Sequence, residues 1–164
     1  MTLCYIGLGS NLDDPEEQVR TACRALQQWP ETRLTAVSSL YRSLPVGPQD
    51  QPDFINAVVA LDTHLEAEPL LDRLQAQEQH QGRIRRRHWG ERTIDLDILL
   101  YGDQLIDQPR LTVPHTELCN RSFVVIPLLE VAPRLTLPNG TPLASLPSAH
   151  DRSLIRLSSA VIDL

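Results

Sequence analysis

Apolar residues recur along this chain with two different spacings, and these spacings predict its strands and helices. Four stretches alternate apolar with polar residues or form short apolar runs, as β-strands do: residues 2–8, 34–42, 54–62 and 92–100. Two further stretches have the three-to-four-residue spacing of amphipathic helices. The chain therefore alternates strand, helix, strand, strand, helix and strand over its first hundred residues.

Start and stop signals bound both helices. Asp14 is the expected N-cap of the first, Pro15 follows in its first turn, and Pro30 ends it. Its core stripe is predicted to be Val19, Ala22, Cys23 and Leu26. The second helix is expected to begin near Pro69 and to end at Gly82, a residue suited to a left-handed cap. Its inward residues are predicted to be Leu70, Leu71 and Leu74.

This element order is the βαββαβ pattern of a ferredoxin-like α/β sandwich, an α+β fold in which an antiparallel sheet carries two helices on one face. Residues 110–129 predict a strand-loop-helix addition beside the sandwich, and residues 153–164 fit either a short strand or a helix. The proline-rich segment 43–53 is too long for a tight hairpin and is a candidate lid. With no linker or repeat, residues 1–164 are expected to form a single domain with a C-terminal extension.

The strand at residues 92–100 is unusual because it carries two acids. Side chains alternate faces along a strand, so Asp95 and Asp97 are predicted to share one face while Ile94, Leu96 and Ile98 take the buried one. At a rise of ~3.3 Å per residue the two Asp Cα atoms lie about 7 Å apart, close enough for both carboxylates to reach one or two divalent cations. The arginine-rich segment 82–90 precedes this strand and indicates an anion held beside the metal.

Each of these features alone has a simpler interpretation, namely solvated acids on an edge strand and a solvated basic turn. Together they are the parts that phosphoryl-type transfer needs, because such catalysis depends mainly on positioning and charge neutralisation.

Composition narrows the possible functions further. The chain has 164 residues, 41% hydrophobic and 22% charged, which is typical of one ordinary soluble domain. Its formal charge of −6 argues against non-specific nucleic-acid binding. All 15 basic residues are Arg, so Schiff-base and Walker-type phosphate chemistry, which require Lys, are excluded. Three cysteines without ligand spacing, no long apolar run and no signal-peptide pattern predict a cytoplasmic protein with reduced thiols and no membrane span.

Four motifs, in order along the chain, resemble one enzyme family. They are YIGLGSNL at residues 5–12, VGPQDQPDFINA at 46–57, HWGERTIDLDIL at 88–99 and LTVPH at 111–115. Together they are similar to the signature of the 6-hydroxymethyl-7,8-dihydropterin pyrophosphokinases of folate biosynthesis, and the resemblance covers residues 1 to about 133. It implies a ferredoxin-like fold and transfer of the β,γ-diphosphate of ATP to the hydroxymethyl group of the pterin, with release of AMP.

The resemblance also implies a division of the site. Asp95 and Asp97 would bind two Mg²⁺ that bridge the ATP phosphates, and Arg83 and Arg92 would act on phosphate or developing charge. The ATP-binding residues would be Gln75, Glu78, Arg85, Trp89, Ile98, Arg110, Thr112, His115 and Arg121. The pterin pocket would consist of Ser43, Val46, Phe54, Asn56 and Phe123, which supply the aromatic walls and the amide that a flat heterocycle requires. Thr116 stands where many members have Tyr, so we leave it out of the expected site.

Some alternatives stay open at this point. No dedicated general base is evident, and our working hypothesis is metal-assisted deprotonation with Asp97 or Asp95 nearby. An RNA-recognition module shares the fold, but 4% aromatic residues and acids on the presumed binding strand argue against nucleic acid as a partner. Another Mg²⁺-dependent phosphotransferase or nucleotidyltransferase is the closest rival. We expect a monomer whose partners are the two small substrates.

Overall fold

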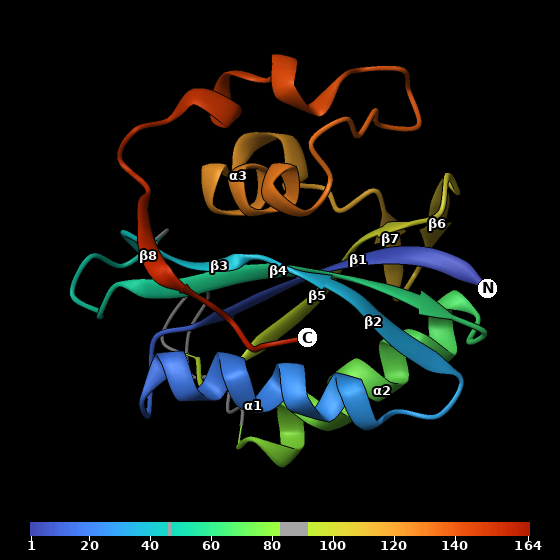
Figure 1. The fold of residues 1–164 in the computed structure, drawn as a ribbon, viewed down its shortest axis with the longest axis horizontal. Coiled ribbons are helices and arrows are strands. Elements are labelled where there is room, and N and C mark those ends of the chain that lie inside the picture. Colours follow the sequence, from blue (N-terminus) through green and yellow to red (C-terminus); the bar gives the residue numbers. More distant parts are fainter. Residues whose placement is uncertain (46, 83–91) are drawn as a thin grey trace.

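The computed structural model describes residues 1–45, 47–82 and 92–164, without the side chains of residues 158 and 159. Its main sheet has six antiparallel strands in the order β5 (Asp95–Tyr101), β1 (Thr2–Ser10), β4 (Phe54–Thr63), β3 (Ser39–Ser43) and β8 (Ile155–Ala160). The sixth strand, β2 (Thr32–Val37), also pairs with β4 (Figure 1). The predicted βαββαβ order and antiparallel sheet are confirmed.

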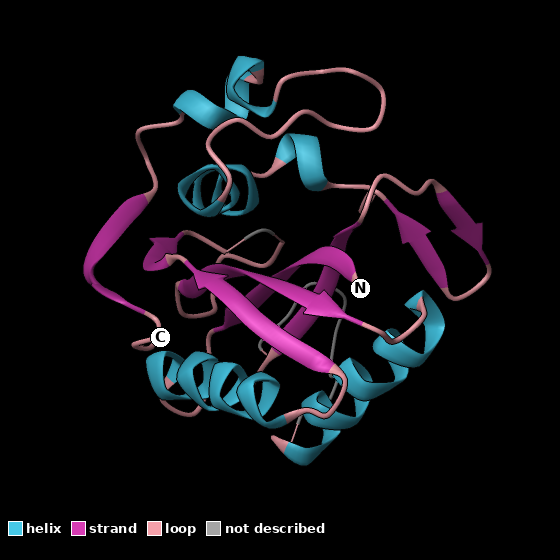
Figure 2. Cartoon of the chain, turned by 45° about the vertical axis from the view of Figure 1, so that its right-hand side comes forward, coloured by secondary structure: helices cyan, strands magenta, loops and turns pink. Residues whose placement is uncertain are grey.

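Helices cover both faces of this sheet. Helices α1 (Pro15–Gln28) and α2 (Ala67–His80) lie on one face, as predicted, and α3 (Ser122–Val131) lies on the other (Figure 1). The short helices η1 (Leu118–Asn120), η2 (Leu143–Ser145) and η3 (Pro147–His150) accompany α3. Figure 2 shows the hairpin of β6 (Ile106–Gln108) and β7 (Leu111–Val113) at the margin of the sandwich. The helical part of the predicted addition therefore covers the open face of the sheet, whereas its strand, β7, lies beside the sandwich as expected.

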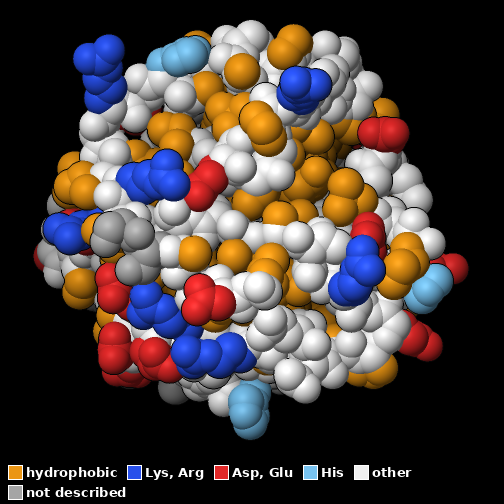
Figure 3. Space-filling view, in the orientation of Figure 1, with side chains coloured by type: hydrophobic (Ala, Val, Ile, Leu, Met, Phe, Trp, Pro, Cys, Tyr) orange, Lys and Arg blue, Asp and Glu red, His pale blue; other side chains and the backbone are white. Residues whose placement is uncertain are grey.

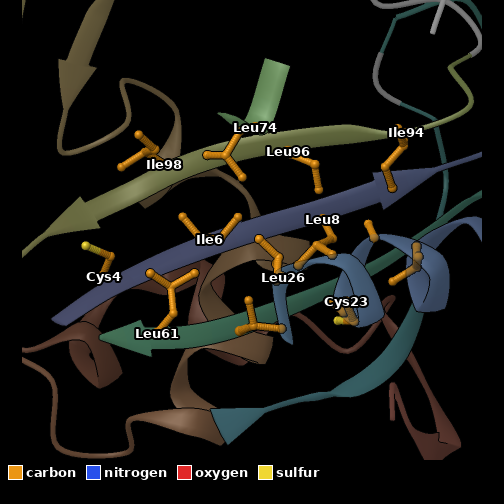
Figure 4. Close-up of a cluster of buried hydrophobic side chains, with 14 of the residues drawn as sticks. Cys4, Ile6, Leu8, Cys23, Leu26, Leu61, Leu74, Ile94, Leu96 and Ile98 are labelled. Atoms are coloured by element: carbon orange, nitrogen blue, oxygen red, sulfur yellow. The ribbon is translucent and has the colours of Figure 1, made fainter. Parts of the chain in front are cut away.

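The sheet has a hydrophobic core on each side. Figure 4 shows Ile6 and Leu8 of β1 and Leu96 of β5 pointing into the same layer as Leu26 of α1 and Leu74 of α2. The opposite core packs Tyr5, Val58, Leu99 and Leu100 against α3, chiefly against its buried residues Val125 and Leu128. Successive side chains of β1 alternate between the two cores, and in β5 a register shift against β1 brings the adjacent Leu99 and Leu100 into the same core. The predicted inward stripes of α1 and α2 are confirmed.

Two local predictions need correction, and one open choice is resolved. The expected strand 34–42 is two strands, because Ser38 leaves the regular ladder: its Oγ accepts the N–H of Val58 at 2.9 Å, and pairing to β4 shifts register there. Asp14 does precede α1, but it has φ 63 and makes no side-chain capping bond. The open choice for residues 153–164 is settled as strand β8, and the short strand β6 has no counterpart among the predicted elements.

Basic and acidic side chains form pairs on the surface of α1. Figure 3 shows arginines and acids side by side over α1, where Arg24 lies 2.8 Å from Glu17 and Arg20 lies 3.8 Å from Glu16. Acids thus neutralise the basic side chains of this helix, and it does not form a basic nucleic-acid surface. Among the described residues, no helix is both long enough and apolar enough to cross a membrane.

Candidate functional site

A cavity of about 380 Å³ opens on the α3 side of the sheet, between β1, β4 and β5 and the start of α3. It is lined by backbone or side chains of Gly7, Leu8, Gly9, Ser43, Leu44, Phe54, Asn56, Ala57, Val58, Arg92, Asp95, Asp97, Leu99, His115, Thr116, Glu117, Arg121, Phe123 and Val124. Residues from every predicted motif therefore meet in one place. The volume suits a small-molecule ligand.

The floor of the cavity depends on two glycines in β1. Ile6 and Leu8 point into the opposite core, so Gly7 and Gly9 occupy the positions that face the cavity. A Cβ added at Gly9 would lie 3.4 Å from Asn56 Oδ1, and one added at Gly7 would lie 3.3 Å from Leu99 Cδ2. Side chains at these positions would fill the floor. The glycines thus permit the close approach of a ligand to the sheet.

Asp95 and Asp97 both line the cavity, while Leu96 and Ile98 are buried in the core behind them. Arg92 Nη1 donates to Asp95 Oδ2 at 2.6 Å, and both side chains are only 16% exposed. The Nε atom of Arg92 is buried without a hydrogen-bond partner among the described residues. An unpaired, buried and positively charged donor beside a cavity is suited to binding an anion.

The pKa of Asp97 is raised, first by burial and then by the negative charge of Asp95. The side chains of His115, Arg121 and Arg92 act in the opposite direction. Two carboxylates held together in a half-buried site favour binding of a cation, which would stabilise both in their charged form. The described residues contain no cluster of three or more His, Cys, Asp and Glu side chains placed to hold a metal. Two carboxylates alone fit Mg²⁺, which binds one or two protein carboxylates and takes further oxygens from substrate phosphates and water.

His115 has a defined hydrogen-bonding role. Its main-chain N–H donates to Leu99 O at 3.1 Å, which fixes the residue against β5. Its ring Nδ1 accepts the N–H of Glu117 at 3.1 Å. In the neutral ring the proton must then be on Nε2, so His115 presents a donor rather than a base while this bond persists.

The other end of the cavity has the character expected for a heterocycle. Asn56 Nδ2 donates to Ser43 Oγ at 2.8 Å, which orients the amide between β4 and β3. Phe54 and Phe123 both contribute to the lining, one at the start of β4 and one in the first turn of α3. The guanidinium of Arg121 lies 5.6 Å from the ring centroid of Phe123. Aromatic and amide groups therefore adjoin the charged groups.

Five of the expected ATP-binding residues lie outside this cavity lining. Arg110 donates to Asp72 Oδ1 at 2.6 Å and to Gln75 Oε1 at 3.2 Å, which places it against the exposed side of α2. Thr112 is exposed on β7. Ile98 and Glu78 are buried.

Glu78 has a structural contact that the sequence did not suggest. Its carboxylate accepts the main-chain N–H of Leu96, the residue between the two aspartates, at 2.8 Å. Glu78 therefore ties α2 to the strand that carries both acids. This contact supports the carboxylate pair from behind the sheet.

Four expected site residues, Val46, Arg83, Arg85 and Trp89, lie outside the described residues. The cavity lining also includes residues that the sequence did not predict, among them Leu44, Leu99, Glu117 and Thr116. Thr116, which was left out of the expected site, lies in the lining beside His115. The alternation of β5 could have suggested Leu99, which is two positions after Asp97.

The comparisons agree with this geometry. Residues 5–133 match the family model for 7,8-dihydro-6-hydroxymethylpterin-pyrophosphokinase. A 2-amino-4-hydroxy-6-hydroxymethyldihydropteridine pyrophosphokinase from Haemophilus influenzae is 50% identical over 159 residues, covering 96% of this chain and 99% of the relative. The enzyme of the same name from Pseudomonas aeruginosa is 56% identical over 145 residues, covering 88% of this chain and 90% of the relative.

A solved structure of Plasmodium falciparum HPPK-DHPS with pteroate has a similar fold. The superposition covers 87% of this chain and 41% of that longer chain, with a TM-score of 0.69 at 12% sequence identity. At that identity the likeness concerns the fold alone. The family match and the relatives, which align over nearly their whole length, establish that this chain belongs to the 7,8-dihydro-6-hydroxymethylpterin-pyrophosphokinase family.

Proposed function

We propose that this chain transfers the β,γ-diphosphate of ATP to the hydroxymethyl group of 6-hydroxymethyl-7,8-dihydropterin, giving AMP and the pterin diphosphate in folate biosynthesis. One observation carries the proposal: a single cavity joins the Asp95 and Asp97 carboxylates with Arg92 to an aromatic pocket containing an oriented amide. The first group suits a polyphosphate with its cation, and the second suits a pterin. The family membership supports the same reaction.

In the pterin half, Phe54 and Phe123 would sandwich the flat ring system. Asn56 uses one Nδ2 hydrogen on Ser43, which leaves its Oδ1 and second hydrogen available for the donor and acceptor edge of the heterocycle. Val46, outside the described residues, is proposed to complete this pocket.

In the phosphate half, Arg92 and Arg121 would bind phosphate oxygens, and His115 would donate from Nε2. Arg83, Arg85 and Trp89 are proposed to add to this half. Asp95 and Asp97 would hold two Mg²⁺. When bound there, the metal would screen phosphate charge and lower the pKa of the substrate hydroxyl.

The nucleotide base would extend past β5 toward α2 and β7. Gln75, Arg110 and Thr112 lie on that side and are exposed, so they could contact the adenosine directly. Ile98 and Glu78 are buried and could contact it only through their main chains or through the strand that they support.

In the reaction, the hydroxymethyl oxygen would attack the β-phosphorus as the bond from that phosphorus to the α,β-bridging oxygen breaks. The bridging oxygen leaves with AMP. We propose that the carboxylate of Asp97 or Asp95 accepts the hydroxyl proton, since the proton on His115 Nε2 leaves that ring a donor. Most of the rate would come from holding oxygen and phosphorus in line and from neutralising charge.

We further propose a monomer that consists of one domain over residues 1–164 and acts in the cytoplasm. Free Cys4, Cys23 and Cys119 support a reducing compartment.

Product analysis tests the proposed reaction. The protein is incubated with ATP, Mg²⁺ and the pterin alcohol, and nucleotides are separated by chromatography. AMP and pterin diphosphate in equal amounts are expected. ADP would instead indicate an ordinary kinase, and pyrophosphate a nucleotidyltransferase; either result would overturn the proposal. RNA binding without turnover would favour a recognition module.

A further inference from the structure

Asn11 belongs to the first motif but was not among the expected site residues, and it connects three segments around the cavity. It follows β1 directly and is 1% exposed. Its main-chain N–H donates to Arg92 O at 3.1 Å, and its side-chain Oδ1 accepts the N–H of Arg92 at 2.9 Å. Its Nδ2 donates to Gln51 Oε1 and to Pro52 O, both at 3.0 Å.

The partners of Asn11 immediately precede the two strands that carry the residues proposed to bind the substrates. Arg92 precedes β5 and pairs with Asp95, whereas Gln51 and Pro52 precede Phe54 at the start of β4. The contacts join residues 40, 41 and 81 positions apart in the chain. One side chain thus spans from the charged half of the cavity to its aromatic half.

The segment that Asn11 holds is itself ordered by glutamine side chains. Gln51 is buried and its Nε2 donates to Pro48 O at 2.8 Å. Gln49 Nε2 donates to Pro45 O at 2.8 Å. These internal bonds hold the segment together, so its contact with Asn11 sets the position of the segment relative to Arg92.

The chemistry of the contact requires an amide. Asparagine offers two hydrogens on Nδ2 and an acceptor oxygen, and here both hydrogens and the oxygen are used. Aspartate has the same shape and would still accept from Arg92, but it would direct a carboxylate oxygen at Gln51 Oε1 and Pro52 O. Asn11→Asp therefore keeps the bond to Arg92 and removes the bonds to Gln51 and Pro52.

We propose that Asn11 is a positioning residue: it fixes the segment entering β4 relative to Arg92, and so fixes the pterin half of the cavity relative to the phosphate half. This inference rests on the proposed function, because the alignment matters only if groups bound in both halves react with each other. A misplacement of about 1 Å between reacting groups costs about 100-fold in rate. Loss of the contact should then lower kcat more than it weakens binding of either substrate alone.

The test compares wild type, Asn11→Asp and Gln51→Met, with Asn139→Asp as a matched control. Asn139 lies in an exposed turn, where its Oδ1 accepts the N–H of Thr141 at 3.0 Å, a bond that aspartate keeps. For each protein, kcat for AMP formation, the Kd of the pterin alone, the Kd of a non-hydrolysable ATP analogue alone and the melting temperature are measured. Gln51→Met removes one of the bonds of Asn11, together with the Gln51 bond to Pro48 O, and serves if Asn11→Asp does not fold.

For Asn11→Asp we expect kcat to fall at least about tenfold while each Kd stays within about threefold of wild type. The kcat of Gln51→Met should fall about fivefold, and the kcat of Asn139→Asp should equal that of wild type. The inference is overturned if kcat is unchanged in both site variants, or if both Kd values weaken in step with the melting temperature, as a purely structural role requires. A wild type that forms no AMP would instead contradict the proposed function itself.

Discussion

Asp95 and Asp97 line one wall of the cavity, and Asp97 is harder to ionise because it is buried and faces the charge of Asp95. Since the folded-state pKa of Asp97 is raised, the folded protein binds the proton more tightly than the unfolded chain does. Stability is therefore lost as pH rises from the ordinary carboxyl pKa through the folded value. At neutral pH the ionised pair costs free energy in the absence of a cation.

Asp97→Asn should consequently raise the stability of the metal-free protein at pH 7, by about 1 kcal/mol, while reducing turnover at least about 100-fold. Thermal unfolding in the presence of a chelator measures the first effect, and AMP formation measures the second. The stability advantage should shrink as pH is lowered to about 3, below the ordinary aspartate pKa of about 3.9, where the aspartate is mostly protonated in both states. The matched control is Asp103→Asn in an exposed turn, which should change neither quantity. A destabilised Asp97→Asn would contradict this account of the pair.

Added Mg²⁺ should stabilise wild type, because a cation bound between the carboxylates exists only in the folded state. Saturation at about 100 times the Kd corresponds to about 2.7 kcal/mol. Differential scanning fluorimetry over a Mg²⁺ series, reversed by a chelator, measures this. The melting temperature of Asp97→Asn should rise much less with added Mg²⁺. An equal rise in both proteins would show that the cation binds elsewhere.

Phe54→Leu should weaken the pterin half selectively. The substitution keeps an apolar side chain at the start of β4 but removes the stacking surface, so the KM for the pterin should rise about tenfold, equivalent to about 1.4 kcal/mol. The KM for ATP should change less than about twofold, because no phosphate contact is removed. Steady-state kinetics with each substrate varied in turn distinguish the two. Equal increases in both KM values would argue against a separate pterin pocket.

Much of this architecture follows from local sequence patterns. The shared face of Asp95 and Asp97 and the inward stripe of α1 depend on periods of two and 3.6 residues, which the chain displays directly. The break between β2 and β3 at Ser38 does not follow from a local pattern, because it depends on a hydrogen bond with Val58, twenty positions away. Strand β8 forms because β3 offers an edge to pair with, and Asn11 reaches partners that only the folded chain brings near. Leu99 could have been found from the alternation of β5, whereas the role of Asn11 depends on such distant contacts.

Glu130 illustrates such a contact and should govern stability in acid. Burial alone raises the pKa of Glu130, but hydrogen bonds from Tyr41 and from the backbone and side chain of Ser39, with the charge of Arg156, outweigh it, and the net pKa is lowered. Tyr41 Oη donates to Glu130 Oε1 at 2.6 Å, and Arg156 of β8 lies 3.2 Å from Oε2. The carboxylate thus ties α3 to β3 and β8.

Because the folded-state pKa is below the unfolded value of about 4.3, this stabilisation is complete above that value and is lost as pH falls through the folded value. Glu130→Gln should therefore lower the melting temperature at pH 7, and the difference from wild type should close as pH approaches about 3. Thermal unfolding of both proteins across this range provides the check. Glu66→Gln, at an exposed position with no capping bond, is the control. A difference that stays constant with pH would show that the charge of Glu130 is not responsible.

The most direct test of the whole account is phosphorus NMR of the complete reaction with wild type and Asp97→Ala in parallel. Wild type should convert ATP and the pterin alcohol into AMP and pterin diphosphate in a ratio of about one to one, as transfer from the β-phosphorus requires. Asp97→Ala, folded by circular dichroism, should form neither product. Release of ADP or pyrophosphate by wild type, or retention by Asp97→Ala of about a tenth of the rate or more, would contradict the account.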